Sequence, residues 1–241
     1  MNFYYKQKKI SGWLLIDKPV GLTSFTVVKE VKRVLKVKVG HCGTLDPFAT
    51  GFILIALGQA TKFIKYAMNF KKRYSLTVKW GVGTDSVDSE GVFIKKSDYF
   101  PSKDEIFEKC KYFTGNIDQV PPIFSAIKVN GKKACSYIRN QITVQLFSRI
   151  TRIFSLKILN HYAYKSMFNI ECCKGFYIRS LVRDLSVKLN THTYVDQLRR
   201  NLSNEFLSLS MLDYKNDFLP FSTKYNIIKN RILPINYIFN N

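Results

Sequence analysis

The chain has 241 residues, and 46% of them are hydrophobic, which is enough for a substantial core and argues against a disordered chain. Lysine and arginine number 38 against 17 acidic residues. The resulting net charge of +21 attracts polyanions, with nucleic acid as the first candidate partner and an anionic membrane surface as the second. A usage bias toward lysine is the alternative reason for this charge.

Several classes of protein are excluded at this point. The longest apolar run, residues 52–57, is much shorter than the ~20 residues of a membrane-spanning helix. The first apolar run is also too short for the core of a signal peptide. The five cysteines form no CxxC pair and the three histidines are scattered, so neither a disulfide framework nor a metal site fits these spacings. We therefore expect a cytoplasmic protein without a metal.

The first elements of the chain follow from its hydrophobic spacing. Residues 13–17 form an apolar run that ends close to Pro19 and predicts a strand. Thr23 and Ser24 can cap a helix whose apolar residues recur on one face: Val27, Val28, Val31, Val34 and Leu35. The other face carries four cations: Lys29, Lys32, Arg33 and Lys36. Such charges are typical of a solvated helix surface, with contact to RNA as the alternative.

The middle of the chain predicts a loop between ordered elements. Residues 40–51 are polar, rich in glycine and interrupted by a proline, which favours a loop over a helix or a strand. Residues 52–57 predict a buried strand and residues 59–68 a short helix. Residues 71–82 alternate between apolar and polar side chains and predict a half-buried strand, with Tyr74 on its apolar face.

The second half of the chain mixes further strands and helices. Ser102 and Glu105 form a capping box that opens a helix, and residues 130–131 (Asn-Gly) predict a hairpin turn. Residues 147–159 and 167–172 predict strands, and residues 178–189 predict a helix. Because the elements follow no regular βαβ rhythm, we predict an α+β fold with a mixed, largely antiparallel sheet flanked by helices.

One carboxylate stands out in the loop over residues 40–51. Asp46 precedes Pro47, which restricts the aspartate to extended backbone conformations and presents its side chain from a stiff segment. An aspartate that merely closes a turn is the simpler alternative, since Asp-Pro pairs are common in turns. From these residues alone, a catalytic Asp46 and a turn-closing Asp46 are both open.

The same loop, with the sequence GHCGTLDPFATG, resembles the catalytic motif of the TruB family of tRNA pseudouridine synthases. Six further segments resemble motifs of that family in the same order: residues 12–24, 72–74, 83–91, 121–132, 174–180 and 198–200. The resemblance extends from about residue 12 to about residue 237. Any one of these motifs is a weak signal, but their shared order is specific.

The resemblance implies an isomerase that converts uridine to pseudouridine at position 55 in the T-loop of tRNA, after flipping the nucleotide out of its stack. It implies Asp46 as the catalytic nucleophile and Arg179 as the cation that pairs with it. Tyr74 is implied to stack on the uracil and to assist proton transfer. Three further residues are implied to bind the substrate: His41, Tyr177 and Leu198. The resemblance implies neither a cofactor nor a metal.

Each of these residues also has a simpler interpretation. Arg179 could be a surface arginine at the start of a helix, and His41 could be a turn histidine with a backbone hydrogen bond. Tyr74 and Leu198 could be ordinary core residues of their strands. The resemblance favours the site roles over these alternatives.

The resemblance further implies one pseudouridine synthase catalytic domain over residues 1–241, with an RNA-gripping insertion at about residues 120–150. Four cations of this insertion are candidates for phosphate contact: Lys128, Lys132, Lys133 and Arg139. Residues 232–236 resemble the junction to the C-terminal PUA domain of bacterial members, and we expect that domain to be absent.

The partner implied is the T stem-loop of tRNA, with no membrane and no obligatory protein partner. Two other readings are open. One is a module that binds or folds tRNA and in which catalysis is secondary. The other is a related synthase that acts inside a guide-RNA particle, which the expected absence of the C-terminal domain disfavours.

Overall fold

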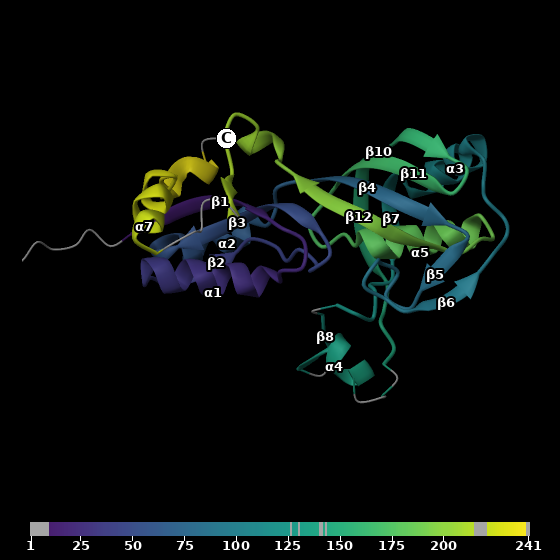
Figure 1. Ribbon diagram of the computed structural model, residues 1–241, viewed down its shortest axis with the longest axis horizontal. Helices are drawn as coiled ribbons and strands as arrows, with labels where there is room; N and C mark the ends of the chain where they lie inside the picture. Colours follow the sequence, from purple (N-terminus) through teal and green to yellow (C-terminus); the bar gives the residue numbers. More distant parts are fainter. Residues whose placement is uncertain are drawn as a thin grey trace, which may run out of the picture. The chain divides into compact units, whose positions relative to one another are not determined.

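The computed structural model describes residues 10–125, 127–129, 131–139, 142, 144–214 and 221–239. The chain forms two compact units, one made of Met1–Phe70 with Arg200–Asn241 and the other of Lys71–Arg199. Both units mix strands with helices, and their paired strands are largely antiparallel (Figure 1), so the predicted α+β fold class is confirmed. The single catalytic domain over residues 1–241 stays a prediction.

The first unit contains a small sheet in the order β13–β1–β3, with β2 also paired to β3. Strand β1 (Gly12–Lys18) runs antiparallel to β3 (Thr50–Leu57), as does the short strand β2 (Val39–His41). Strand β13 (Leu212–Asp213) lies parallel to β1 on its other side. The two strands predicted in this part of the chain are therefore confirmed.

Helix α1 (Ser24–Leu35) is the helix that the apolar spacing predicted. Its N-cap is Thr23, whose hydroxyl oxygen accepts a hydrogen bond from the Thr26 backbone N–H at 3.0 Å. The helix ends at Lys36, which has the left-handed conformation with φ 53°. Both boundaries follow from local capping, so the faces of α1 are fixed relative to the sheet that it covers.

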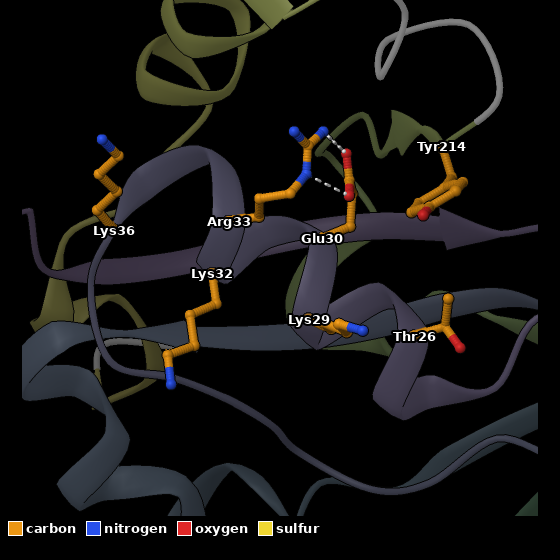
Figure 2. Close-up of a pocket in the computed structure, with 7 residues that line it drawn as sticks. All are labelled: Thr26, Lys29, Glu30, Lys32, Arg33, Lys36 and Tyr214. Atoms are coloured by element: carbon orange, nitrogen blue, oxygen red, sulfur yellow. Dashed lines mark hydrogen bonds and ion pairs between the residues drawn. The ribbon is translucent and has the colours of Figure 1, made fainter.

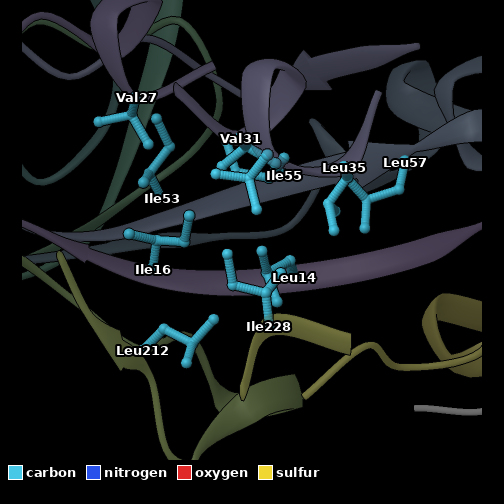
Figure 3. Packing of buried hydrophobic residues seen from close by; sticks show 11 residues of the cluster. Leu14, Ile16, Val27, Val31, Leu35, Ile53, Ile55, Leu57, Leu212 and Ile228 are labelled. Atoms are coloured by element: carbon cyan, nitrogen blue, oxygen red, sulfur yellow. The ribbon is translucent and has the colours of Figure 1, made fainter. Parts of the chain in front are cut away.

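One core of the first unit lies between α1 and the sheet and is built from branched aliphatic side chains (Figure 3). Its fully buried members come from β1, β3, α1, β13 and helix α7 (Phe221–Asn230): Leu14, Ile16, Val27, Val31, Ile53, Ile55, Leu57, Leu212 and Ile228. Alternate residues of a strand face opposite ways, so every second residue of β1 and β3 enters this core.

The intervening residues of β1 and β3 form a second core on the opposite face of the sheet. It contains Trp13, Phe52 and Phe206, and the Trp13 indole N–H donates to the Ile235 carbonyl at 2.9 Å. Short helical segments cover this face: η1 (Gly58–Phe63), α2 (Ile64–Ala67), η3 (Asn204–Phe206) and η4 (Ile235–Phe239). The predicted helix at residues 59–68 is thus confirmed as helical, although its first half is a 3₁₀ helix.

The second unit is built on five strands in the order β12–β4–β11–β10–β7. They are β4 (Lys72–Trp80), β7 (Gly115–Gln119), β10 (Arg149–Tyr162), β11 (Lys165–Cys172) and β12 (Thr193–Asn201). The pairs β4–β11, β11–β10 and β10–β7 are antiparallel. The predicted strands over residues 147–159 and 167–172 are confirmed.

Two longer helices belong to the second unit. Helix α3 (Lys103–Cys110) begins with the predicted capping box, in which Ser102 and Glu105 each accept a backbone N–H of the other, and it continues into η2 (Lys111–Phe113). Helix α5 (Ile178–Lys188) buries an apolar face and confirms the helix predicted at residues 178–189. Among the described residues, no helix is long and apolar enough to cross a membrane.

The strand predicted over residues 71–82 is divided at Gly81. This glycine has φ +85°, and a Cβ at its position would lie 2.7 Å from the Phe100 ring, so the chain turns where only glycine fits. After the turn, β5 (Val82–Thr84) pairs with β6 (Phe93–Lys96) in a separate two-stranded sheet.

The predicted hairpin turn is confirmed by two short antiparallel strands, β8 (Lys128–Val129) and β9 (Lys132–Lys133), which precede helix α4 (Ala134–Arg139). Gly131 in the turn has φ +79°, as such turns require. Asn130 lies outside the described residues, and so do the side chains of the four proposed phosphate contacts: Lys128, Lys132, Lys133 and Arg139.

The prediction that residues 40–51 form one loop is wrong at both ends. His41 ends β2 and pairs with Ile55, while Thr50 starts β3 and Gly51 pairs with Lys18. Backbone pairing with a neighbouring strand overrides the local polarity of these residues, which is a tertiary effect. The true loop is therefore residues 42–49.

The two cores lead to a prediction for stability. Ile55 is fully buried in the core under α1, so the variant Ile55→Ala should lower the free energy of unfolding by about 2–5 kcal/mol. The matched variant Ile150→Ala changes an isoleucine that is 79% exposed and should alter it by about 0.5 kcal/mol or less. Equal losses in denaturant titrations of the two variants would contradict this packing.

Candidate active site

Asp46 lies at the first position of a tight turn in the loop between β2 and β3. The Ala49 backbone N–H donates to the Asp46 carbonyl at 3.2 Å, and Pro47 occupies the second position of this turn, which proline favours. The neighbouring side chains of Leu45 and Phe48 are buried, whereas Asp46 is half-buried. The loop is thus anchored by apolar residues on both sides of the carboxylate.

Ser24, the first residue of α1, holds the residue before Asp46. Its hydroxyl donates to the Leu45 carbonyl at 3.0 Å and accepts from the Leu45 N–H at 2.8 Å. The serine is 2% exposed, so these hydrogen bonds form away from water. Both backbone groups of Leu45 are therefore satisfied by one side chain from a different element.

Lys18, the last residue of β1, holds the residue after Asp46. Its side chain is fully buried, and its Nζ donates to the carbonyls of Pro19, Leu22 and Pro47 at 2.9, 2.7 and 3.1 Å. A buried ammonium needs such acceptors, because an unsatisfied charge away from water is very costly. The three carbonyls thereby fix the turn that carries Asp46 against the end of β1.

Arg200 holds both ends of the loop in the first unit. Its guanidinium donates to the carbonyls of Gly43, Thr44 and Phe52 at 3.2, 3.3 and 2.6 Å, and its side chain is buried. A Cβ on Gly51 would lie 2.2 Å from the Arg200 carbonyl oxygen, which explains the glycine that closes the loop motif. Side chains from three segments remote in sequence therefore fix the Asp46 loop.

His41 precedes this loop at the end of β2 and is half-buried. Burial lowers the pKa of its imidazole, and the positive charge of Arg200 lowers it further, while a backbone hydrogen bond with Gly43 acts in the opposite direction. The imidazole is therefore neutral near pH 7.

Arg179 lies in the second unit, near the start of α5, and is only 4% exposed. This rules out the interpretation as a surface arginine. Its guanidinium lies 3.4 Å from Asp88 Oδ2 and donates to the carbonyls of Ser86 and Phe124 at 3.3 and 2.9 Å. The planar group is therefore held in one orientation by an ion pair and two carbonyls from separate segments.

Asp88 is itself fixed by the tight loop between β5 and β6. Its Oδ1 accepts hydrogen bonds from the Ser86 hydroxyl at 2.6 Å and from the Glu90 N–H at 3.1 Å. Val87, the residue before it, has φ +61°, which is rare and strained for a β-branched residue. The strain indicates that the surrounding contacts determine the position of Asp88.

The start of α5 is anchored by Gln119, the last residue of β7. Its side-chain amide donates to the Tyr177 carbonyl at 3.1 Å and its oxygen accepts from the Tyr177 N–H at 2.9 Å. The Ser180 hydroxyl donates to the Val120 carbonyl at 2.8 Å. These bonds fix the backbone on both sides of Arg179 and leave the Tyr177 side chain half-exposed.

Tyr74 and Leu198 lie on the neighbouring strands β4 and β12 of the second unit, and both are buried. Tyr74 pairs across the sheet with Ile170 on β11. Both side chains are thus part of the buried face of the sheet, and their contact with a nucleotide stays a prediction.

The six predicted site residues divide between the two units. Asp46 and His41 lie in the first, and Tyr74, Tyr177, Arg179 and Leu198 lie in the second. The ion pair between Asp46 and Arg179, which lie in different units, stays a prediction. Within the second unit, the acidic partner of Arg179 is Asp88.

Several residues position these groups without having been assigned that role from the sequence: Lys18, Ser24 (expected only as a helix cap), Asp88, Gln119 and Arg200. Four of them lie inside or beside segments that match the family motifs, which was the available signal; Gln119 precedes such a segment by two residues. Among the described residues, no group of three histidine, cysteine or acidic side chains could hold a metal ion. A reaction without a metal or cofactor stays a prediction.

Ser24 provides a test of how the loop is held. The variant Ser24→Ala leaves both backbone groups of Leu45 buried without their partner and should cost about 1–3 kcal/mol in the free energy of unfolding. Hydrogen exchange at the Leu45 amide should become faster. The control Ser148→Ala, at an exposed serine, should leave both quantities unchanged. Unchanged Leu45 exchange in Ser24→Ala would show that another contact fixes the loop.

The chain is similar to proteins of known family. Residues 31–178 match the model of the N-terminal domain of TruB family pseudouridylate synthases. The tRNA pseudouridine synthase B of Zymomonas mobilis is 42% identical over 205 residues, which are 83% of this chain and 68% of that protein. The enzyme of the same name from Anaplasma marginale is 41% identical over 229 residues, 94% of this chain and 74% of that protein.

Solved structures show the same fold. The synthase fold in a Cbf5–Nop10–Gar1 complex superposes with a TM-score of 0.68 at 24% identity, over 94% of this chain and 61% of that chain. At this level of identity the likeness concerns the fold alone. The matched family model, the relatives above 40% identity and the loop around Asp46 agree, and the chain belongs to the TruB family of pseudouridylate synthases, isomerases that convert uridine to pseudouridine.

Proposed function

We propose that the chain converts uridine to pseudouridine at position 55 in the T-loop of tRNA and that the Asp46 carboxylate acts on the flipped nucleoside. The relatives are named for activity on tRNA. The observation that carries the proposal is the fixed loop, in which Lys18, Ser24 and Arg200 hold the backbone on both sides of Asp46. Because the loop is already ordered, no conformational entropy of the loop has to be lost when the substrate binds.

The reaction breaks the C1′–N1 bond of the nucleoside and joins C1′ to C5 of the same uracil. N1 then gains a proton and C5 loses one, so the base stays in the pocket and the atoms balance without a cofactor. Asp46 either attacks C1′, attacks the uracil ring, or assists a glycal route. All three routes need one ionised carboxylate aimed at the nucleoside.

Arg179 is the cation that we propose for Asp46. A carboxylate that leaves water tends toward its neutral form, and a neighbouring guanidinium opposes this shift. Asp88 and two carbonyls already hold the Arg179 guanidinium in one orientation, which supports a positioning role toward a second carboxylate. An arginine can bind two carboxylates at once, because its five N–H groups lie in one plane and point in several directions.

The remaining site residues are proposed to hold the flipped nucleotide. Tyr74 stacks on the uracil and its hydroxyl assists removal of the C5 proton, while Tyr177 and Leu198 line the pocket. His41 braces the stack that the uridine leaves, and its neutral imidazole suits stacking on a base. Extrusion of the nucleotide costs a few kcal/mol, which these contacts offset.

The proposal also covers the contacts with the rest of the tRNA, the cellular compartment and the need for partners. The hairpin-bearing insertion at about residues 120–150 grips the T stem-loop, and the net charge of +21 attracts the RNA backbone. The enzyme works in the cytoplasm, where its tRNA substrate is, and needs no obligatory protein partner. A module that binds or folds tRNA, with catalysis secondary, is the alternative that the next experiment separates.

The variant Asp46→Asn tests the proposal. It should bind tRNA as the wild type does and lose at least about 10³-fold in the rate of pseudouridine formation at position 55, mapped chemically in the RNA product. The control Asp98→Asn changes an aspartate that is 97% exposed and should retain full activity. A wild type that binds tRNA without forming pseudouridine would favour the binding module, and an active Asp46→Asn would overturn the role of Asp46.

The Asp88–Arg179 pair gives a second prediction. Both side chains are about 5% exposed, so Asp88→Asn removes a buried carboxylate from the guanidinium and should cost about 3–5 kcal/mol of stability. Turnover of bound tRNA, measured well below the unfolding temperature, should fall about 10- to 100-fold because Arg179 loses its fixed orientation.

The matched control for this prediction is Asp196→Asn. It removes an ion pair of 3.0 Å with Lys79 in which the lysine is 40% exposed, and such exposed pairs contribute little. Wild-type turnover in Asp88→Asn, at a temperature where the variant is folded, would separate the pair from catalysis.

A further inference from the structure

The outward face of α1 lines a groove in the first unit. Figure 2 shows its lining residues, which come from α1, from Lys36 after the helix and from Tyr214: Thr26, Lys29, Glu30, Lys32, Arg33, Lys36 and Tyr214. The groove has a volume of about 640 Å³. The proposed reaction uses none of these residues.

The cations of this face have fixed positions. The opposite face of α1 is fully buried in the core, with Val27 and Val31 at 0% exposure, so the helix cannot turn its charges elsewhere. Lys29 and Lys32 lie one turn apart on α1, and Lys36 follows the last residue of the helix in the left-handed conformation. Figure 2 shows the Lys36 side chain pointing away from that of Lys32, so the three lysines form a cluster over the second half of α1.

Among the described residues, the charge of the groove is not balanced. Glu30 is the one acid among its described lining residues, and it forms a two-fold hydrogen-bonded ion pair with Arg33 at 2.6 and 3.0 Å. In the part of the chain that the structure describes, Lys29, Lys32 and Lys36 have no ion-pair partner. Exposed lysines elsewhere, such as Lys79, do pair with carboxylates. The described residues thus leave three exposed lysines on this face without an acidic partner.

Tyr214 adds a polar edge to the groove. Burial raises the pKa of its phenol, and the nearby Glu30 raises it further, against a smaller effect of Arg33. The hydroxyl therefore stays protonated and can donate a hydrogen bond to an anionic oxygen.

From this arrangement we propose that Lys29, Lys32 and Lys36 form a second RNA-binding surface, which contacts backbone phosphates of the substrate RNA outside the reaction pocket. The inference rests on the proposed function, since it takes RNA as the ligand. Exposed ammonium groups on one cluster suit neighbouring phosphates and carry no base specificity. The surface thus adds affinity and orientation, and leaves the choice of uridine to the pocket.

A membrane surface fits this face less well. Helices that lie in a membrane interface place an apolar face among the lipid chains. In α1 that face is already buried in the protein core, and the groove-lining residues of the helix are polar or charged. RNA is therefore the polyanion that the geometry favours.

The test compares two triple variants with the same loss of charge. The α1 variant replaces the three lysines of the groove (Lys29→Gln, Lys32→Gln, Lys36→Gln). The control variant replaces three exposed lysines of the second unit (Lys95→Gln, Lys103→Gln, Lys157→Gln). The dissociation constant for tRNA is measured from about 0.05 to 0.3 M salt, together with turnover at saturating tRNA. Thermal unfolding verifies that both variants are folded.

The α1 variant should bind tRNA about 10- to 100-fold more weakly at about 0.1 M salt, and its slope of log K against log salt should fall by about 2 to 3. Its turnover at saturation should match the wild type. The control should lose about threefold or less. Equal losses in both variants, or none in either, would overturn the inference and make the charge a general property of the surface.

Two further outcomes are distinguished. A wild type that forms no pseudouridine in the tRNA would refute the proposed function, whereas normal product formation with unchanged affinity of the α1 variant refutes this inference alone. Binding to vesicles with anionic phosphatidylserine that the α1 variant loses, while tRNA affinity is unchanged, would assign the face to a membrane instead.

Discussion

The chemistry proposed for this chain depends on the fixed position of a single loop. Side chains remote in the sequence reach its backbone from both sides of Asp46: Lys18 from the end of β1, Ser24 from the start of α1, and Arg200 from the end of β12. All three are buried, and all three bind main-chain groups of the loop or of its ends. These side chains bind buried backbone N–H and carbonyl groups that would otherwise lack a hydrogen-bond partner. The loop is thereby held in one conformation although it has no regular secondary structure.

Two buried arginines illustrate how differently one residue type is stabilised. Arg200 donates to three carbonyls, and among the described residues it has no acidic partner; it holds the loop within the first unit. Arg179 has an acidic partner, Asp88, besides two carbonyls, and it lies near the start of a helix whose first turn is itself held by Gln119. The outward lysines of α1 are the opposite case, since they are exposed and have no acidic partner among the described residues. The three sets of cations therefore differ in burial and in the kind of partner they have among the described residues.

Local patterns predicted most of the elements. The valine spacing of α1, the Ser102–Glu105 capping box and the Asn-Gly turn each act over a few residues, and each is confirmed. The errors arise where distant segments decide. The strand ends at Gly81, where the Phe100 ring leaves no room for a Cβ. His41 pairs with Ile55 on β3, and Thr50 is the first residue of that strand. The motif around Asp46 pointed to the site, but the burial of Lys18 and the partner of Arg179 depend on contacts between remote segments, which spacing cannot reveal.

We propose above all that the Asp46 carboxylate, paired with Arg179, meets a uridine swung out of the T-loop. A crystal structure of the chain bound to tRNA measures this arrangement. We expect a carboxylate oxygen of Asp46 within about 3.5 Å of C1′ or of the uracil ring of uridine 55, with the Arg179 guanidinium in ion-pair distance of the same carboxylate. A uridine 55 that stays stacked in the RNA, or an Asp46 that faces bulk solvent away from Arg179, would contradict it.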